Sequence, residues 1–308
     1  MGDKKDKLSK MIKKIREAPT SLRHKLDSTI NSVVALTGMR PDSFPYLSGD
    51  GFRQIADWVY DETGTCRPSE IKEGQLVFLK ADKVEEWFGN IHPKINYRYT
   101  LISHNSDYNI TEADLNFIDD KIIHWYAQNV KVVHPQLTPI PIGINNLYLN
   151  YTERSSLFRK LNRIIPVRKN RIIFAFSIST NPTERQPAHD VLTSLPVADN
   201  TEWIRDRYRY LRTVRNYKFI AAPDGNGNDD PRRWQAMYVG VVPIVTRTAS
   251  MEYFKSLGLP LYIIDDWREL ARLEEKDLER IYDELKDGFG RAELYADFWV
   301  DKIKQNDK

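Results

Sequence analysis

One stretch of the chain, residues 218–245, constrains the fold more than any other: KFIAAPDGNGNDDPRRWQAMYVGVVPIV. The apolar run 219–222 has the length of a β-strand, and Pro223 ends it. Gly225 and Gly227 follow in a polar loop, where glycine adopts turn conformations at no steric cost. A helical stretch and a second apolar run come next. The stretch therefore predicts a strand, a loop, a helix and another strand, an order typical of α/β proteins.

The end of this loop has the pattern of a helix N-terminus. Asp229 or Asp230 can serve as the N-cap, and Pro231 suits the first helical position because its missing N–H is not needed there. A helix N-terminus carries free N–H groups and about half a positive charge, which favours a bound phosphate group. Arg232 and Arg233 add positive charge beside it. An ordinary capped helix with solvated arginines explains the same residues, so both interpretations stay open.

Short apolar segments followed by polar residues recur along the chain. They form two sets, the first at 75–82, 97–107, 121–130 and 136–146, and the second at 171–179, 213–223, 241–247 and 259–267. Strands separated by helical stretches predict parallel sheets with crossover connections, and 308 residues suit two domains. We therefore predict four parts: a basic amphipathic segment 1–40, an N-terminal Rossmann-like domain 41–165, a C-terminal Rossmann-like domain 166–290, and a C-terminal helix 291–308.

Composition excludes several classes of protein. The 46 basic and 43 acidic residues leave a net charge of +3, too small for nucleic-acid binding by the whole protein. Cys66 is the single cysteine, which excludes an internal disulfide and a cysteine-based zinc site. The histidines lack metal-binding spacing, and the motifs of serine hydrolases and P-loop phosphate sites are missing. No apolar run reaches the roughly 20 residues of a membrane span, so we expect a cytoplasmic protein.

Positive charge gathers at the start of the chain. The first 25 residues contain nine basic and three acidic side chains. The apolar residues Leu8, Met11, Ile12 and Ile15 fall on one face of a helix. A basic amphipathic helix of this kind could make peripheral contact with an anionic membrane through Lys4 to Arg23, or pack as a solvated helix on the body of the protein.

Polar side chains stand where the predicted strands end. In the first half these residues are Ser103, His104, Asn105, Asp107, Gln128 and Asn129, and in the second half they are 177–185 and 224–232. Ligands of open α/β sheets bind beyond the carboxyl ends of the strands. We therefore expect a cleft with one wall from each half.

At this point the residues resemble a known family, the exostosin-like glycosyltransferases. The similarity is carried by FIAAPDGNGNDDPRRWQAMYVGVVPIV, then LPLYIIDDWREL, and upstream by PYLSGDGFRQIAD, IHPKINYRYTLISHNSD, WYAQNV and PIPIGINN. These segments span most of residues 45–270. The resemblance implies a GT-B architecture of two facing Rossmann-like domains, with the final helix crossing back to the first. It also implies a nucleotide sugar held by the second domain, an acceptor held by the first, and no obligatory metal.

The family's motif can be carried over residue by residue. Its loop is matched at Pro223, Gly225, Gly227 and Asp229, its arginine at Arg232, and its helix at Trp234 and Ala236. Gln235 stands where the family commonly has glutamate, and Pro231 where it often has histidine. A carboxylate accepts two hydrogen bonds from a diol, whereas an amide accepts at one end and donates at the other. The exchange leaves the donor open, and it leaves open a homologue without activity.

Candidate roles follow from the strand ends and from the resemblance. For binding the nucleotide sugar we name Arg185, Pro223, Asp224, Gly225, Asn226, Gly227, Asp229, Arg232 and Gln235. For binding the acceptor we name Arg53, Asn105, Gln128 and Asn129. A catalytic base must lie within roughly 3 Å of the acceptor hydroxyl, and the candidates are Asp107, His104 and Asp50. The alternatives are that residues 103–107 only form a turn and that Arg185 is a plain surface residue.

The resulting hypothesis is a glycosyltransferase of polysaccharide biosynthesis, metal-independent and inverting. It moves a sugar from a nucleotide donor, with a UDP-sugar favoured, to a glycan or polysaccharide hydroxyl, and it needs no further cofactor. The first alternative is a catalytically silent nucleotide- or sugar-binding homologue in a glycan assembly complex. The second is a membrane-surface adaptor that acts through Lys4 to Arg23, which explains only the first segment.

Overall fold

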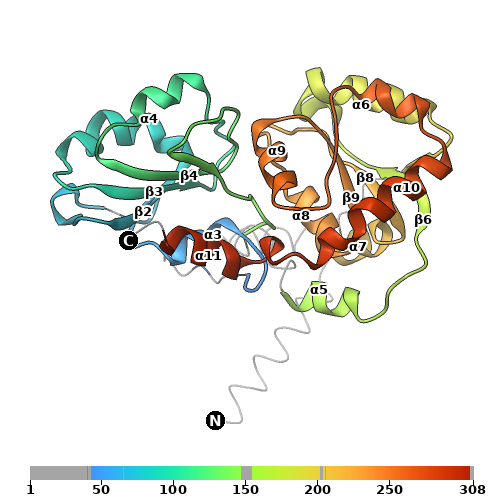
Figure 1. Ribbon diagram of the computed structural model, residues 1–308, viewed down its shortest axis with the longest axis horizontal. Helices are drawn as coiled ribbons and strands as arrows, with labels where there is room; N and C mark the ends of the chain where they lie inside the picture. The colour runs from blue at the N-terminus through green and yellow to red at the C-terminus, as the bar shows by residue number, and fades with distance from the viewer. Residues whose placement is uncertain are drawn as a thin grey trace, which may run out of the picture.

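The computed structural model describes residues 40, 43–64, 66–146, 155–201, 204 and 206–305. The predicted segment Lys4 to Arg23 lies outside these residues. Two separate α/β lobes stand side by side (Figure 1). None of the helices within the described ranges has the length and apolarity that crossing a bilayer requires.

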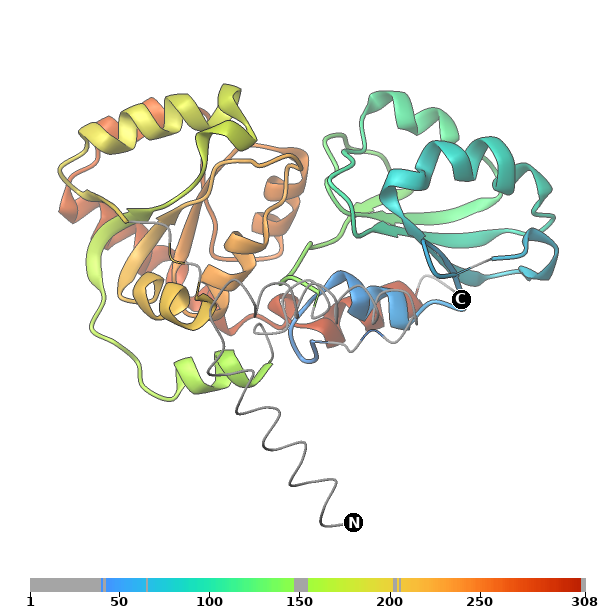
Figure 2. The same cartoon turned by 180° about the vertical axis from the view of Figure 1, so that it is seen from behind.

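The first lobe is built on a five-stranded parallel sheet of order β1-β2-β3-β4-β5. Its strands are β1 (Trp58–Tyr60), β2 (Gln75–Lys80), β3 (Tyr99–His104), β4 (Ile122–Ala127) and β5 (Leu137–Pro139). Short helices cover one face, namely η1 (Pro68–Glu70), η2 (Ala81–Lys83), α4 (Val84–Glu86), the π-helix η3 (Trp87–Ile91), η4 (His92–Lys94) and η5 (Glu112–Phe117). The helix α3 (Gly49–Gln54) lies on the opposite face (Figure 2).

The second lobe is a parallel sheet of order β10-β9-β8-β6-β7. Its strands are β6 (Lys169–Phe174), β7 (Ala198–Asn200), β8 (Tyr217–Ala221), β9 (Val242–Thr246) and β10 (Tyr262–Ile264). Its main helices are α6 (Pro182–Ser194), α7 (Arg207–Val214), α8 (Pro231–Tyr238), α9 (Ala249–Ser256) and α10 (Glu275–Leu285). Shorter helical turns are η6 (Ile178–Thr180), η7 (Trp267–Arg272), η8 (Lys286–Gly290) and η9 (Ala292–Leu294).

Alternate residues of the strands enter different cores, because successive side chains of a strand point to opposite faces. In β2, Leu76 and Phe78 face the core beneath the sheet, whereas Val77 and Leu79 face the core under the short helices. The central strands β2, β3, β8 and β9 are buried on both faces, which explains their nearly continuous apolar sequences. The core beneath the first sheet continues beneath the second, where α7, α8 and α9 cover it.

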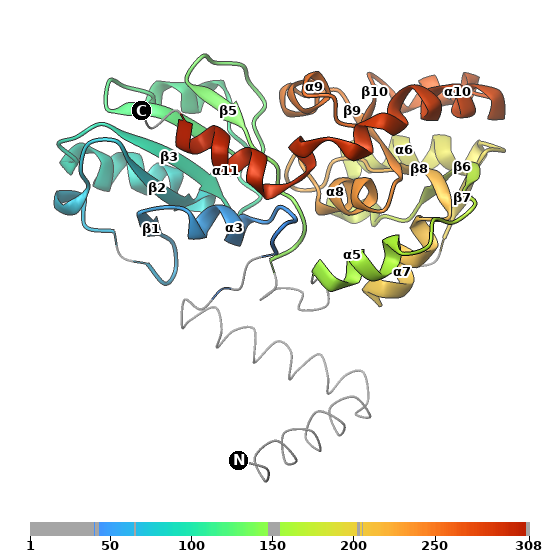
Figure 3. The ribbon, with the colours of Figure 1, turned by 60° about the horizontal axis from the view of Figure 1, so that its bottom comes forward.

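The last helix, α11 (Ala296–Gln305), crosses from the second lobe to the lower face of the first sheet (Figure 3). Trp299 and Ile303 are fully buried in the core that contains Leu76 and Phe78. The N–H of Ala296 also donates to the carbonyl of Pro45 at 2.9 Å. Two parallel α/β sheets with a C-terminal helix that returns to the first domain form the GT-B arrangement, so the predicted fold class is confirmed.

The helix α5 (Ser155–Asn162) lies with the second lobe, although the predicted first domain extends to residue 165. Asn162 donates from its amide to the carbonyl of Tyr238 in α8 at 2.8 Å, and Arg215 donates to the carbonyl of Leu161. We therefore place the domain boundary before α5.

Candidate functional site

The strand order of the second sheet creates a topological switch point between β6 and β8. From β6 the chain proceeds to β7 on one side, and from β8 it proceeds to β9 and β10 on the other. Ligands of doubly wound sheets bind in the crevice that opens at such a point. The loop at residues 222–230 begins directly after β8, so the loop singled out by sequence lies at this crevice.

Arg185, in α6, joins the loops that follow β6 and β8. Its Nε donates to the carbonyl of Asp224 at 2.8 Å, and its Nη1 donates to the carbonyl of Ser177 at 3.0 Å. Its Nη2 lies 3.5 Å from a carboxylate oxygen of Asp230. Burial, and then the charge of the neighbouring Arg232, lower the pKa of Arg185. The side chain is buried rather than a plain surface residue, and most of its donors hold the two loops in place.

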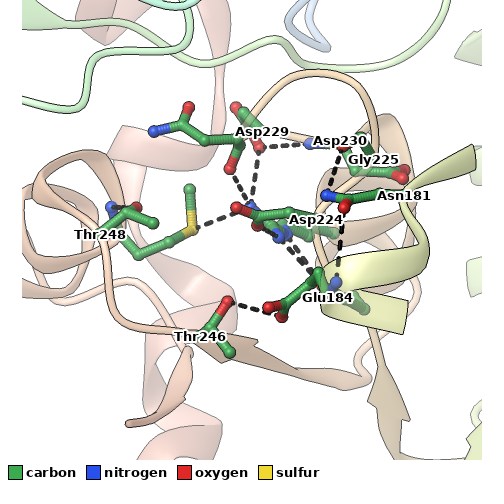
Figure 4. A network of polar contacts seen from close by, with 12 residues as sticks. Asn181, Glu184, Asp224, Gly225, Asp229, Asp230, Thr246 and Thr248 are labelled. Atoms are coloured by element: carbon green, nitrogen blue, oxygen red, sulfur yellow. Dashed lines mark hydrogen bonds and ion pairs between the residues drawn. The ribbon is translucent and has the colours of Figure 1, made fainter. Parts of the chain in front are cut away.

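The loop itself is shaped by Arg233, which sequence reasoning did not include among the candidate site residues. Its guanidinium is buried and donates to the carbonyls of Ala222 and Asn228 and to the carboxylate of Asp224. Figure 4 shows Asp224, Asp229 and Asp230 of this loop close together, with Asn181, the N-cap of α6, beside them. A helical residue one position further along points about 100° away, which is why Arg233 faces inward and its neighbour does not.

Asp229 is buried, and its carboxylate receives several N–H donors. It accepts from the indole of Trp234 at 3.0 Å, from the backbone of Ile142 at 2.9 Å and from the backbone of Asp230 at 2.9 Å. Burial raises the pKa of Asp229 to about 6, against the opposing charge of Arg233. These contacts hold the loop against the segment after β5. Contact between Asp229 and the nucleotide-sugar donor stays a prediction.

Asp230 is the N-cap of α8, and its carboxylate accepts from the N–H of Arg232 at 2.8 Å. One guanidinium nitrogen of Arg232, Nη2, lies 3.4 Å from the same carboxylate. The other, Nη1, is buried and has no hydrogen-bond partner in the described part of the chain. Arg232 therefore keeps a donor for a ligand at the N-terminus of α8.

Arg232 borders a cavity of about 210 Å³. The other lining residues are Asn145, Ala175, Ile204, Arg207, Tyr210, Asp230, Pro231 and Gln235. Gln235 belongs to the predicted site, and its Oε1 accepts from Nη1 of Arg207 at 3.4 Å. Arg207 and Tyr210 come from α7 and were missed by sequence reasoning. The strand before α7, β7, is three residues long and reads ADN, so no apolar run marks it.

The opposite wall is formed by the loops after β3 and β4. Asn105 and Asn129 both adopt left-handed backbone conformations, with φ of 62° and 57°, which asparagine tolerates better than most residues. The N–H of Asn105 donates to the side chain of Gln128 at 3.1 Å, and its amide donates to Asp50 at 3.3 Å and accepts from Asn146 at 2.9 Å. Neutral amides thus order this wall.

A second cavity, of about 370 Å³, lies between this wall and α8. Its lining residues are Gly49, His104, Asn105, Ser106, Asp107, Gln128, Ile142, Ile144, Asn145, Asn146 and Pro231. Asn145 and Pro231 line both cavities, so the two adjoin each other. The predicted acceptor residues Asn105 and Gln128 line this cavity, whereas Arg53 and Asn129 do not. Arg53 instead donates to Asp61 at 2.7 Å, in the turn after β1.

The three candidate bases differ in accessibility. Asp107 is exposed at the cavity. His104 is buried, donates from Nε2 to the carbonyl of Pro141 at 3.0 Å and accepts at Nδ1 from the N–H of Asn105. Burial lowers the pKa of His104 to about 4, so the ring is neutral. Asp50 is buried, does not line the cavity, and has its pKa raised to about 6 by burial.

The two walls contact each other directly. The amide of Asn226 donates to the carboxylate of Asp107 at 3.0 Å, and the N–H of Asp229 donates to the side chain of Asn129 at 2.9 Å. A side chain at Gly227 would lie 2.5 Å from the amide of Asn129, so glycine permits this close approach. The loop after β8 is therefore held from both domains.

Comparison with known proteins finds similarity to solved structures, and this similarity is weak. No protein family and no curated protein matches the chain. Spinosyn rhamnosyltransferase SpnG complexed with thymidine diphosphate is 10% identical, with a TM-score of 0.32 over 75% of this chain and 68% of that one, and a second SpnG structure has the same values. The GtfA/B complex is 11% identical, with a TM-score of 0.35 over 77% of this chain and 58% of that one. Similarity at this level carries no argument about activity.

Proposed function

We propose that this protein is a glycosyltransferase that moves a sugar from a nucleotide donor to a glycan hydroxyl. The observation that carries the proposal is the unpartnered Nη1 of Arg232 at the N-terminus of α8, beside a cavity at the switch point of the second sheet. Charge-assisted hydrogen bonds from arginine suit a diphosphate. The resemblance to exostosin-like enzymes favours a UDP-sugar and inversion at the anomeric carbon.

The charges of the two adjoining cavities support a division between donor and acceptor. The cavity beside Arg232 is also lined by Arg207, whereas none of the described residues that line the cavity beside Asp107 is a lysine or arginine. An anionic diphosphate is favoured in the first and disfavoured in the second. The amides of the second cavity offer donors and acceptors to a neutral polyol, so its occupant is the acceptor sugar.

The reaction then follows from this placement. The acceptor oxygen attacks the anomeric carbon while the bond from that carbon to the diphosphate oxygen breaks. The hydroxyl proton passes to Asp107, the accessible carboxylate of the cavity. The nucleoside diphosphate leaves with the bonding electrons, and the guanidinium of Arg232 and the positive end of the α8 dipole stabilise its charge.

The first experiment is a thermal-shift titration of the full chain with UDP, GDP, CMP and ADP and with their sugar conjugates. A nucleotide that binds the folded state raises the midpoint of unfolding. We expect one nucleotide to raise it in the parent protein and not in Arg232→Ala. The matched control is Arg209→Ala, because Arg209 is an exposed arginine of α7 that does not line the cavity. Equal shifts in all three proteins would contradict the assignment of Arg232.

A second candidate function is a catalytically silent binding protein, which Gln235 favours because it stands in place of the family's glutamate. A radiolabelled donor identified by the titration separates the two. Transfer to an acceptor, or slow hydrolysis of the donor, supports the enzyme. Saturable binding with neither reaction, under conditions in which added glycans also bind, supports the silent protein.

A further inference from the structure

The segment after α5 presents aliphatic side chains to solvent. Ile164, Ile165 and Val167 are 75%, 80% and 99% exposed. Single exposed aliphatic residues are common on soluble proteins, but three within four positions form a patch that calls for a partner. The cleft described above does not involve these residues.

The loop that carries this aliphatic patch is anchored at both ends. Arg215 donates to the carbonyls of Leu161 and Ile164, and Arg168 donates to the carbonyl of Val239 at 2.9 Å. The backbone of the loop is thus tied to α5, α7 and the end of α8. We attribute the outward direction of the aliphatic side chains to this anchoring and not to a poorly held loop.

Cations lie on the two helices next to the aliphatic patch. Arg159 and Lys160 of α5 and Arg163 just after it are exposed. The helix α7 packs beside α5 and adds the exposed Arg209 and Arg212 (Figure 3). Within the described stretches 155–168 and 206–215, Asp206 is the one acidic residue.

We infer that the patch formed by Ile164, Ile165 and Val167, with the cations of α5 and α7, is a docking surface for an anionic lipid bilayer. Exposed aliphatic side chains can enter the boundary between headgroups and acyl chains, while arginine and lysine meet the anionic headgroups. Charge complementarity alone would also suit a nucleic acid, but that partner leaves the aliphatic side chains in water. This surface lies in the described domain and is distinct from the basic segment Lys4 to Arg23. The inference does not depend on the proposed reaction.

The test is cosedimentation of the full chain with vesicles of phosphatidylcholine alone and of phosphatidylcholine mixed with phosphatidylglycerol. We expect binding to the mixed vesicles, and a loss of about tenfold or more when Ile164, Ile165 and Val167 are all replaced by serine. The matched control is Val133→Ser, because Val133 is 88% exposed on the first domain. This control is expected to bind as the parent does.

The charged half of the surface is tested by Arg159→Glu combined with Arg163→Glu. This variant is expected to bind mixed vesicles about tenfold or more weakly, and added salt is expected to weaken the parent. Parental binding by the triple serine variant would overturn the inference and assign membrane contact to the segment Lys4 to Arg23. No binding of the parent to mixed vesicles would also overturn it and point to a protein partner.

Discussion

The two walls of the cleft use different chemistry to hold similar loops. In the first wall, amides and backbone groups around Asn105 and Gln128 order the ends of β3 and β4. In the second, the buried guanidinium of Arg233 and three nearby aspartates order the loop after β8. The difference shows that part of the charge in the second wall has a structural role. These charged side chains shape the loop, and Arg232 remains available to a ligand.

Each wall has a buried aspartate in contact with it or within it: Asp50 of α3 contacts Asn105, and Asp229 belongs to the loop after β8. Burial raises the pKa of both Asp50 and Asp229 to about 6. The carboxylate of Asp229 accepts N–H donors at both oxygens, whereas Oδ2 of Asp50 has no hydrogen-bond partner in the described structure. The pKa therefore rises for both aspartates, although hydrogen bonds hold the carboxylate of Asp229 more firmly than that of Asp50.

The largest expected effect comes from Arg233→Leu. Removing this buried cation leaves Asp229 without its opposing charge and two carbonyls without donors, so we expect a loss of about 3–5 kcal/mol in the free energy of unfolding. Urea denaturation measures it. On the first wall, Gln128→Leu is expected to cost about 1–3 kcal/mol because only neutral partners are left unpaired. Equal losses would remove the proposed contrast between the walls.

The next effect separates the two aspartates. In Asp229→Asn an amide nitrogen must face an N–H donor, so we expect a loss of about 1–3 kcal/mol at neutral pH. Asp50→Asn keeps Oδ1, the oxygen that accepts from Asn105 and from Nη1 of Arg40, and places the amide at the unpartnered position. It is therefore expected to be at least as stable as the parent above pH 6. Urea denaturation of the two variants at pH 7 decides between these outcomes.

The pH dependence has a definite sign. Because the folded pKa of Asp50 is raised from 3.8 to about 6, its stabilising contribution is present below about pH 4 and is lost as the pH rises through about 6. Asp50→Asn should therefore flatten the fall in unfolding free energy between about pH 4 and pH 7 by about 2–3 kcal/mol. An unchanged slope would mean that Asp50 titrates normally.

A smaller effect is expected where the walls touch. Gly227→Ala places a methyl group 2.5 Å from the side chain of Asn129 in the other domain, whereas Gly225→Ala places one at the longer distance of 3.1 Å from Nη2 of Arg185. We expect Gly227→Ala to cost about 1–2 kcal/mol by overpacking, and Gly225→Ala to cost less. Thermal unfolding of both variants compares them, and a reversed order would place the tight contact within the second domain.

The smallest effect on stability is expected for Asp107→Asn, within about 0.5 kcal/mol, because the residue is exposed. Its effect on transfer should be large, about 10²- to 10⁴-fold in kcat, if the carboxylate is the base. Asn226→Ala removes the hydrogen bond that Asn226 donates to Asp107 across the cleft, and it keeps the carboxylate. Transfer rates that fall equally in both variants would assign Asp107 to holding the loop rather than to chemistry.

Much of the fold could be predicted because its signals are local. Parallel strands buried on both faces read as short apolar runs, and the loop and helix start at residues 223–231 follow from proline, glycine and aspartate. The cap is Asp230, one of the two residues that the sequence allowed. Some of the polar residues at the strand ends line the two adjoining cavities, namely His104, Asn105, Asp107, Gln128, Asp230 and Arg232, whereas Ser103, Asn129 and Arg185 do not.

The parts that could not be predicted from the sequence depend on contacts in the folded structure, which no local sequence pattern reveals. Adjacent arginines look alike in sequence, yet the phase of α8 buries Arg233 and leaves Arg232 at the cavity. Arg53 was placed with the acceptor, but it pairs with Asp61 because its helix faces the turn after β1. Arg207 was missed because it follows a strand of three residues without apolar character.

The apolar core that runs beneath both sheets makes the molecule one cooperative unit. Tyr46 of the first domain lies with its ring 4.7 Å from the ring of Tyr238 in the second, inside this core. The helix that covers the lower face of the first sheet comes from the end of the chain. A calorimeter should therefore record a single heat-absorption peak. A fragment that ends at residue 146 would keep α3 on the lower face of the first sheet but would lack Trp299 and Ile303 of α11, so the first domain completes its core only after α11 is made.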